Sequence, residues 1–349
     1  MKNWIIAALL ASAFPLAAQT PFEERVDVDL VLLDVTVTDR EGNQILGLRK
    51  DDFIVTENGV EQPIDSMDYF TNRRLLDAPE AQAQFQVERN REARYFILFF
   101  HEIGDPGMIP GYRSELMRAR QAAGDWIRDE IQPQDLVAVA GFDTRLKIYA
   151  DFTNDRKILE SALHGVTGFS NGLREVPDYA GSASIMREIN VRKMVNQTGR
   201  IFDALQMMGD ALRSFPARKQ MVVFSHGIGE PSTLDASLPD HDERRYRPMA
   251  GALNRANVTV DAISMLRSST RIYGPEQILA RLADETGGEF YRNFATFQTP
   301  LDRVEELSSG YYLLSYRTHR KESEHGYQRV KVKLRNPEFE VRAREGYAY

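Results

Sequence analysis

The chain has no cysteine among its 349 residues. This absence excludes disulfide bonds, thiolate metal sites, a cysteine nucleophile and a lipid-modified N-terminal cysteine together. The chain also has fewer basic than acidic residues, with 44 Lys and Arg and 51 Asp and Glu, so its net charge is -7. Nucleic-acid binding by diffuse charge needs a concentrated positive field, so nucleic acid is not an expected partner.

Two further absences narrow the possible functions. The sequence has no glycine-rich loop that ends in Lys, and no Gly-x-Gly-x-x-Gly follows the first buried strand. Nucleotide chemistry therefore has no support. Beyond the N-terminus, no segment stays apolar over the roughly 20 residues that a membrane-spanning helix needs. We therefore expect a mature chain without a transmembrane span.

The N-terminal residues have the pattern of a secretory signal peptide. Lys2 precedes an apolar run over residues 4–16, and small residues follow that run. The run is too short for a membrane span, and the order of basic, apolar and small segments is that of an export signal. We predict cleavage after Ala18, which removes residues 1–18, and an exported protein that is periplasmic or secreted.

Residues 26–72 have the pattern of an all-β segment. Apolar and polar residues largely alternate over residues 26–39, which is the two-residue period of a half-buried strand. Asn58-Gly59 lies between two short runs, and both residues tolerate the positive φ of a tight hairpin. Residues 73–93 are polar and rich in Ala and Gln, so we expect a linker there.

Residues 94–309 alternate between buried strands and amphipathic helices. The strands are predicted from four short apolar runs, RYFILFF, DLVAVAGF, KQMVVFS and NVTVDAI. Such runs are typical of strands that are covered on both faces. Repeated units of strand and helix predict an α/β domain with a doubly wound, mostly parallel sheet of Rossmann-like type.

Residues 310–349 return to the alternating period of β-structure. A few isolated strands are not stable on their own. We therefore expect residues 26–72 and 310–349 to pair into one accessory β-sandwich or sheet, with the α/β domain inserted between them.

These segments, in this order, resemble the von Willebrand factor type A (vWA)-related proteins of the acidobacterial kind. The likeness spans nearly the whole mature chain and rests on LLDVTVTDREGNQILGLRKDDFIVTENGVEQPI, RYFILFF, RKQMVVFSHGIGE, ANVTVDAIS and GYYLLSYR. The resemblance implies a vWA fold that is flanked by β segments and exported. It also implies binding to protein partners, which many vWA domains achieve through a metal-ion-dependent adhesion site.

The resemblance places the ligands of that Mg²⁺ site at the carboxyl ends of the strands. They are Asp-x-Ser-x-Ser after the first strand, a Thr before a helix and an Asp after a later strand, all of which supply the oxygen atoms that Mg²⁺ prefers. The matching positions of this chain hold His101, Ile103, Asp105, Gly199 and His226. A shift by one residue brings in Glu102 or Thr198 but not the whole set. We therefore expect a degenerate adhesion site without the standard Mg²⁺ ion.

The replacements leave two alternatives for this region. His101 and His226 would lie at the ends of neighbouring strands, where two imidazoles with Glu102, Asp105 or Asp143 could hold Zn²⁺ or another transition metal. Alternatively, the site has decayed, and both histidines are hydrogen-bonded or surface residues of loops. The sequence leaves both alternatives open.

An esterase-like hydrolase is a further alternative. Residues 226–229 match a His-Gly-x-Gly oxyanion loop, and Ser170 is the centre of a Gly-x-Ser-x-Gly pattern over residues 168–172. A nucleophile elbow must follow a strand and open a helix, whereas this pattern follows a predicted helix and precedes residues without a helical period. The loop and the elbow also come in the wrong order, which disfavours Ser170 as a nucleophile.

We predict a protein-interaction module that is not an enzyme and has no cofactor other than a possible divalent metal. Binding is expected at the loops after the strands, over residues 101–112, 165–199 and 226–231. Apolar anchors often dominate interfaces, and the expected ones are Ile103, Met108, Ile109, Tyr112 and Ile228. The alternative is that these side chains pack their loops onto the domain.

Overall fold

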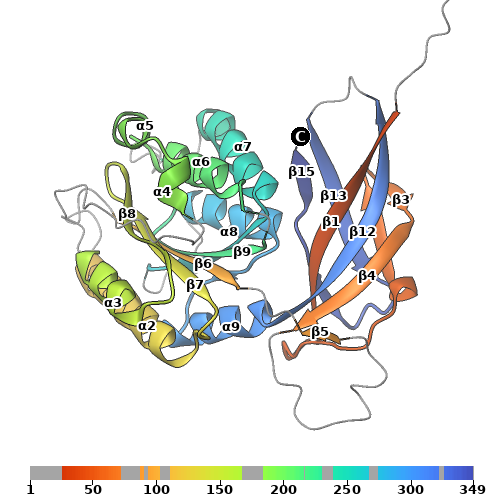
Figure 1. The fold of residues 1–349 in the computed structure, drawn as a ribbon, viewed down its shortest axis with the longest axis horizontal. Coiled ribbons are helices and arrows are strands. Elements are labelled where there is room, and N and C mark those ends of the chain that lie inside the picture. Colours follow the sequence, from red (N-terminus) through yellow and green to blue (C-terminus); the bar gives the residue numbers. More distant parts are fainter. Residues whose placement is uncertain are drawn as a thin grey trace, which may run out of the picture.

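The computed structural model consists of an α/β domain and a β-sandwich (Figure 1). It describes residues 26–71, 87–89, 93–102, 111–166, 184–215, 217–229, 239–266, 274–321 and 326–348. The predicted signal peptide lies outside these ranges, as do Ile103, Asp105, Met108, Ile109 and Ser170. Within these ranges, no helix is long and apolar enough to cross a membrane.

A six-stranded sheet forms the centre of the α/β domain. Its strands are β6 (Tyr95–His101), β7 (Leu136–Phe142), β8 (Leu146–Thr153), β9 (Lys219–Ser225), β10 (Val258–Ser264) and β11 (Phe290–Tyr291). They lie in the order β11-β10-β9-β6-β7-β8, and only the β7–β8 pair is antiparallel. Side chains of β6 alternate between two cores, with Phe96 in one and Ile97 in the other. Burial on both faces explains the absence of polar residues from the middle of this strand.

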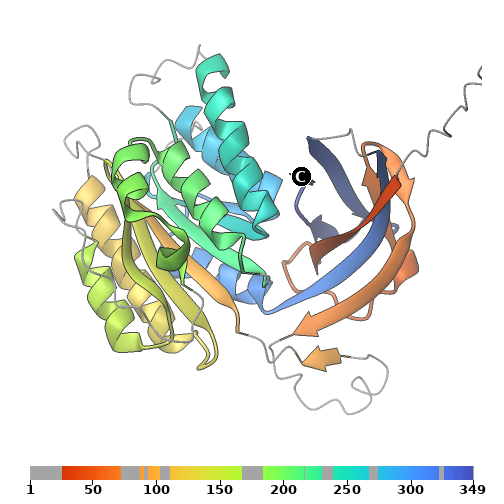
Figure 2. The same cartoon turned by 45° about the horizontal axis from the view of Figure 1, so that its top comes forward.

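Helices cover both faces of the sheet (Figure 2). The core on one face includes residues of α2 (Tyr112–Asp129), α3 (Arg156–Gly165) and α9 (Gln298–Ser308). The core on the other face includes residues of α4 (Ile185–Glu188), α5 (Val191–Gln197), α6 (Ile201–Leu212), α7 (Pro239–Arg255) and α8 (Gly274–Thr286). In α2, Leu116, Ala119 and Ala123 are buried because they recur on one helical stripe.

The β-sandwich is built from both ends of the chain. Its strands are β1 (Val26–Thr38), β2 (Phe53–Glu57), β3 (Val60–Gln62), β4 (Ile64–Thr71), β5 (Val87–Arg89), β12 (Gly310–Lys321), β13 (Tyr327–Leu334), β14 (Glu340–Arg342) and β15 (Gly346–Ala348), and a 3-10 turn, Lys50–Asp52, precedes β2. One sheet has the order β14-β1-β12-β4-β5 and the other β15-β13-β2-β3. Residues 26–35 of β1 pair antiparallel with residues 312–321 of β12. The inward side chains of β1, such as Leu33 and Val35, form the core between the sheets.

The predicted fold class is confirmed at the level of a mostly parallel α/β sheet with additional antiparallel sheets. One expectation differs, because β5 lies within the region predicted to be a linker. β5 pairs in parallel with residues 69–71 at the end of β4. A strand of three residues is added by backbone hydrogen bonds, which the polar composition of this region does not reveal.

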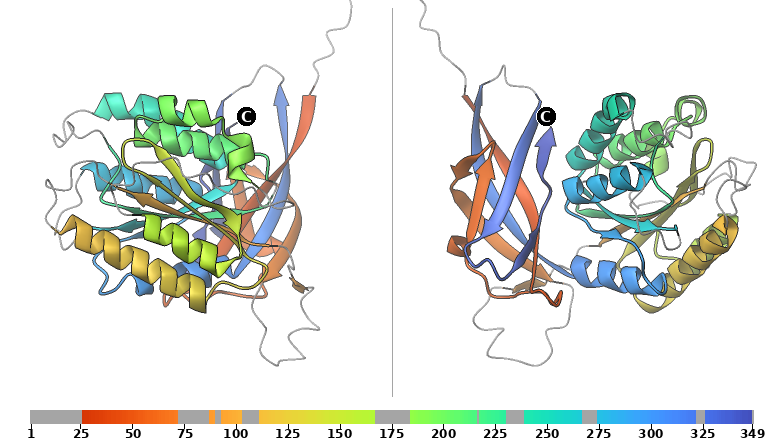
Figure 3. Two further views of the ribbon diagram at one scale, coloured as in Figure 1. Left: turned by 60° about the vertical axis from the view of Figure 1, so that its left-hand side comes forward. Right: turned by 180° about the vertical axis from the view of Figure 1, so that it is seen from behind.

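The sandwich meets the α/β domain at the amino ends of the sheet strands (Figure 3). Asn257, directly before β10, donates from Nδ2 to Asp34 Oδ2 of β1 at 3.0 Å. Arg218, directly before β9, has its Nε 4.0 Å from the same oxygen. The strands of the α/β sheet other than β8 run in the same direction, so these contacts lie at the end of the sheet opposite the carboxyl ends of its strands.

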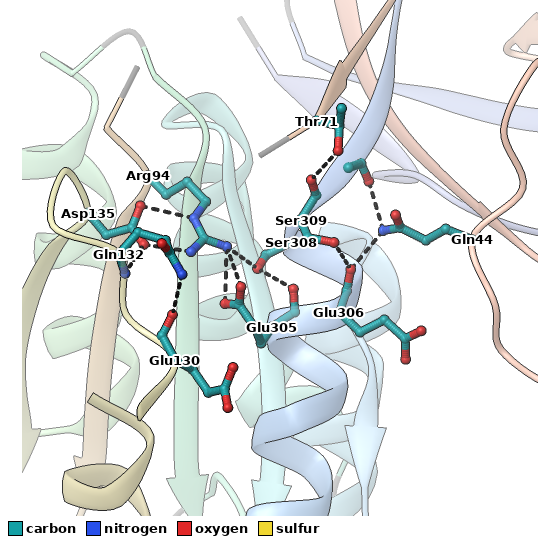
Figure 4. A network of polar contacts seen from close by, with 11 residues as sticks. Gln44, Thr71, Arg94, Glu130, Gln132, Asp135, Glu305, Glu306, Ser308 and Ser309 are labelled. Atoms are coloured by element: carbon teal, nitrogen blue, oxygen red, sulfur yellow. Dashed lines mark hydrogen bonds and ion pairs between the residues drawn. The ribbon is translucent and has the colours of Figure 1, made fainter. Parts of the chain in front are cut away.

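A network of polar contacts holds the end of α9 from both domains (Figure 4). Arg94, directly before β6, lies 2.5 Å from the buried Asp135 carboxylate and 2.9 Å from Glu305 of α9. From the sandwich, Gln44 Nε2 donates to Glu306 O at 2.8 Å, and Thr71 Oγ1 donates to Ser309 O at 3.2 Å. These bonds fix α9 where the chain passes into β12.

Candidate functional site

The switch point of the α/β sheet lies between β6 and β9. From β6 the chain continues to β7 on one side, and β9 continues to β10 on the other side. Open α/β sheets bind ligands at such a point, outside the carboxyl ends of the strands. β6 ends at His101, which Glu102 follows, and β9 ends at Ser225, which His226 follows.

His101 and the end of β9 are joined by a hydrogen bond. His101 Nδ1 lies 2.8 Å from Ser225 Oγ. The same hydroxyl donates to Gly227 O at 2.9 Å and accepts from Gly227 N at 3.0 Å, which fixes the turn after β9. Burial lowers the pKa of His101 to about 4, so this imidazole is neutral at physiological pH.

His226 is buried, with 5% of its surface exposed. Neither of its ring nitrogens has a hydrogen-bond partner in the described part of the chain. Its ring lies beside that of Tyr112, with 4.9 Å between the ring centroids. Burial, with a smaller contribution from His101, lowers the pKa of His226 to about 3. A buried polar group without a partner costs about 1–3 kcal/mol.

The two described carboxylates of the expected metal set have other contacts. Glu102 is fully buried, and its Oε1 accepts from Tyr149 Oη of β8 at 2.6 Å. Asp143 lies 2.5 Å from Lys147 Nζ and accepts from Thr144 N. Among the residues in the described ranges, no group of three or more His, Asp, Glu or Cys side chains is arranged to hold a metal ion. Asp105 lies outside those ranges, so a set that includes it remains a prediction.

At the positions that the sequence resemblance assigns to Mg²⁺ ligands, His101 and His226 are neutral imidazoles, whereas Mg²⁺ prefers oxygen ligands. The neighbouring Thr198 is not available either, because its Oγ1 accepts from Leu146 N at 2.9 Å and is buried. Gly199 supplies no side chain.

The backbone geometry of residues 226–229 disagrees with an oxyanion hole. Gly227 N–H donates to Ser225 Oγ, and Ile228 N–H donates to Pro275 O at 2.9 Å. Two of the donors that a hydrolase would direct at its substrate are therefore used within the protein. Gly227 is required for packing, because its φ is 126° and a Cβ there would lie 2.5 Å from Pro275 Cβ.

Two of the expected partner-binding side chains are not on the surface, and the prediction is wrong for them. Tyr112 has 2% of its surface exposed, because it starts the buried stripe of α2. Ile228 is fully buried, since its backbone bond to Pro275 draws it into the core under α8. Both side chains are part of the packed interior of the domain.

Sequence reasoning missed Ser225, which links His101 to the turn after β9. Its position at the end of an apolar run was the available signal, since a polar residue there lies at the carboxyl edge. It also missed the contact between Tyr112 and His226, which requires the start of α2 to lie over the end of β9.

A groove of about 790 Å³ lies beside the same edge. Met265 and Leu266, which follow β10, form part of its wall. The opposite walls come from α2 and from residues 293–298, including Phe294 and Phe297. The groove is therefore a concave surface with both polar and apolar residues, close to the carboxyl end of β10.

Comparison with known proteins gives a likeness in fold only. No known protein family matches the chain, and no curated protein matches it. Solved structures similar to it include BatB from Bacteroides thetaiotaomicron, with 14% identity over 62% of this chain and 98% of that chain and a TM-score of 0.38. The SpRpn10 VWA domain has 14% identity over 60% of this chain and 94% of that chain, with a TM-score of 0.35.

A third similar structure is proximal thread matrix protein 1 from the mussel byssus with a zinc-occupied MIDAS motif. It has 15% identity over 63% of this chain and 47% of that chain, with a TM-score of 0.36. Solved structures similar to this chain thus include vWA domains. Identities and TM-scores this low carry no argument about what the chain binds.

Proposed function

We propose that this protein is an exported, non-catalytic interaction module of the vWA type. It binds a protein partner through the loops at the carboxyl edge of the α/β sheet, over residues 101–112, 165–199 and 226–231. The observation that supports this proposal is the placement of the sandwich. The sandwich is joined to the amino edge through Asp34, Gln44 and Thr71, which lie at the end of the sheet away from the switch point.

The chemistry at the switch point favours recognition without a bridging Mg²⁺ ion. His101 and His226 are neutral, and neither the described carboxylates nor Thr198 is directed to a shared site. A partner would therefore be held by hydrogen bonds and apolar contacts from the loops. With Tyr112 and Ile228 buried, Ile103, Met108 and Ile109 are the proposed contacts.

Deletion of residues 106–110 tests the proposal. Gly111 is kept because it is the N-cap residue of α2 and has a positive φ of 79°, which favours glycine. We expect the variant to keep its melting temperature within a few degrees and to lose the partner that the intact chain captures from cell envelopes. A Val60→Lys variant of the sandwich, where the side chain is 64% exposed, should capture the partner as the intact chain does.

A transition-metal site is the second candidate, favoured by the unpaired ring nitrogens of His226. It would use His101, Glu102, Asp105 and His226, and imidazole is a preferred ligand of Zn²⁺. Metal analysis of the purified chain and of His226→Ala tests it. Metal bound in equal molar amount to the intact chain and lost from the variant supports the site, and no bound metal in the intact chain contradicts it.

A further inference from the structure

Strand β13 bears a row of basic side chains on the outer face of its sheet, which has the strand order β15-β13-β2-β3. Val330 is buried in the core of the sandwich, and Val332 and Leu334 pack against that core. Side chains alternate between the two faces of a strand, so the residues between these three point away from the core. All the residues of this outward set on β13 from position 329 on are basic and exposed. They are Arg329, Lys331 and Lys333, and we call them the basic row.

The basic row has a regular spacing. Residues two apart on one strand are separated by about 6.7 Å, so the three cations extend over about 13 Å. Arg335 follows β13 directly and adjoins the row, and its Nε donates to Asp51 O at 2.7 Å. That bond to a backbone carbonyl holds the side chain and does not neutralise its charge.

The neighbouring strands supply no opposite charge next to the basic row. On β2, Thr56 lies opposite Lys331, and Ile54 lies opposite Lys333. Glu61 of β3 lies opposite Thr56, which places this carboxylate on the same face but two strands away from the row. Positive charge on the strands of this face is therefore confined to β13, with neutral side chains on β2 and an acidic one on β3.

The uncompensated charge of the basic row is unusual for this chain. Arg317 on β12 of the other sheet has an Asp65 carboxylate oxygen at 3.0 Å, and Arg342 of β14 has one of Glu289 at 3.0 Å. The basic row has no such ion pair within the described ranges, although acidic residues outnumber basic ones in the chain. Like charges about 7 Å apart repel one another, and anions placed over the row would offset that repulsion.

We propose that the basic row binds an extended acidic segment of a partner protein, with Asp or Glu at every second residue. Because the positive charge follows a single strand, its complement is a narrow anionic chain and not a broad anionic surface, which would also meet Glu61. An extended polypeptide has the same rise per residue as β13, so alternate carboxylates repeat every 6.7 Å or so, and each can face one cation. This surface is on the sandwich, and so it is independent of the loops at the carboxyl edge.

A peptide titration followed by NMR on the full chain tests the proposal. The probe is the peptide ETETETETET, in which carboxylates alternate with Thr, a residue that favours extended structure. At about 10 mM ionic strength, the amide signals of the basic row should shift with a Kd of about 1 mM, because exposed ion pairs are individually weak. Raising the ionic strength to about 150 mM should weaken binding at least about threefold through screening.

Two comparisons separate the basic row from general charge attraction. Lys331→Glu combined with Lys333→Glu should weaken binding at least about tenfold, because two attractions become repulsions. Lys157→Glu combined with Arg244→Glu makes the same change in net charge at exposed sites of α3 and α7 and should bind as the intact chain does.

A second peptide, EETTEETTEE, tests the spacing. It has one carboxylate more than the probe, but on each face of the extended peptide the carboxylates are about 13 Å apart. It should therefore bind at least about twofold more weakly. Three results would overturn the proposal: no shift at about 5 mM probe, equal binding by the Lys331 and Lys333 double variant, or binding of the second peptide as tight as that of the probe. Binding to phosphatidylglycerol vesicles that this double variant loses, without binding of the probe, would overturn it in favour of a membrane surface.

Discussion

At the scale of single residues, His226 is the feature that most needs an explanation. A buried imidazole with two unpaired nitrogens lowers stability, and packing against Tyr112 offsets only part of that cost. Groups that lower stability in this way are often retained at functional sites. Its neutral form is also the form that can accept a hydrogen bond from a partner.

The lowered pKa of His226 predicts a loss of stability in acid. An unfolded histidine titrates near pH 6.5, whereas folded His226 has a pKa of about 3. As the pH falls from about 6.5 to 4, unfolding takes up a proton, and the free energy of unfolding falls by at most about 1.4 kcal/mol per pH unit. His226→Phe should remove the contribution of His226 to the slope of the free energy of unfolding against pH. Urea unfolding at several pH values measures that slope.

His164→Phe is the matched control, because it replaces an exposed histidine of α3 by the same residue. Asp261, whose pKa burial raises to about 6, contributes with the opposite sign, since stability falls as the pH rises through that range. Asp261 is present in the intact chain and in both variants, so its contribution cancels when their pH slopes are compared. Equal slopes for His226→Phe and the intact chain would contradict the assignment.

At the scale of elements, Arg94 before β6 holds the end of α9 against the α/β sheet. Its guanidinium contacts Asp135 and Glu305, whose side chains are 0% and 18% exposed. Removing one partner of a buried ion pair leaves an uncompensated charge, which costs more than the pair itself contributes.

Arg94→Ala should therefore lower the free energy of unfolding by about 3–5 kcal/mol. Arg128→Ala is the control, because it breaks contacts with Asp125 and Asp129 at a side chain that is 62% exposed. It should lower the free energy of unfolding by less than about 0.5 kcal/mol. Urea unfolding of both variants measures the difference. Similar values for the two variants would contradict a stabilising role of the Arg94 network.

The sequence predicted elements well where burial is uniform and poorly where distant segments meet. The apolar run of β6 and the alternation in β1 follow from local burial, so both were visible. The contact between Asp34 and Asn257 was not, because it joins residues that are 223 positions apart in the sequence. The burial of Tyr112 likewise depends on how α2 lies over the end of β9.

At the scale of the whole molecule, the two edges of the α/β sheet are used differently. The amino edge is joined to the sandwich, and the carboxyl edge bears the switch point with His101 and His226.

Site-specific photo-crosslinking tests the central claim most directly. Arg145 lies exposed between β7 and β8 at the carboxyl edge, and Glu61 lies exposed on β3 of the sandwich. With a photoreactive residue at either position in cells, the account predicts that the partner lost on deletion of residues 106–110 is crosslinked from position 145 and not from 61. Crosslinking of that partner from position 61 alone would contradict recognition at the carboxyl edge.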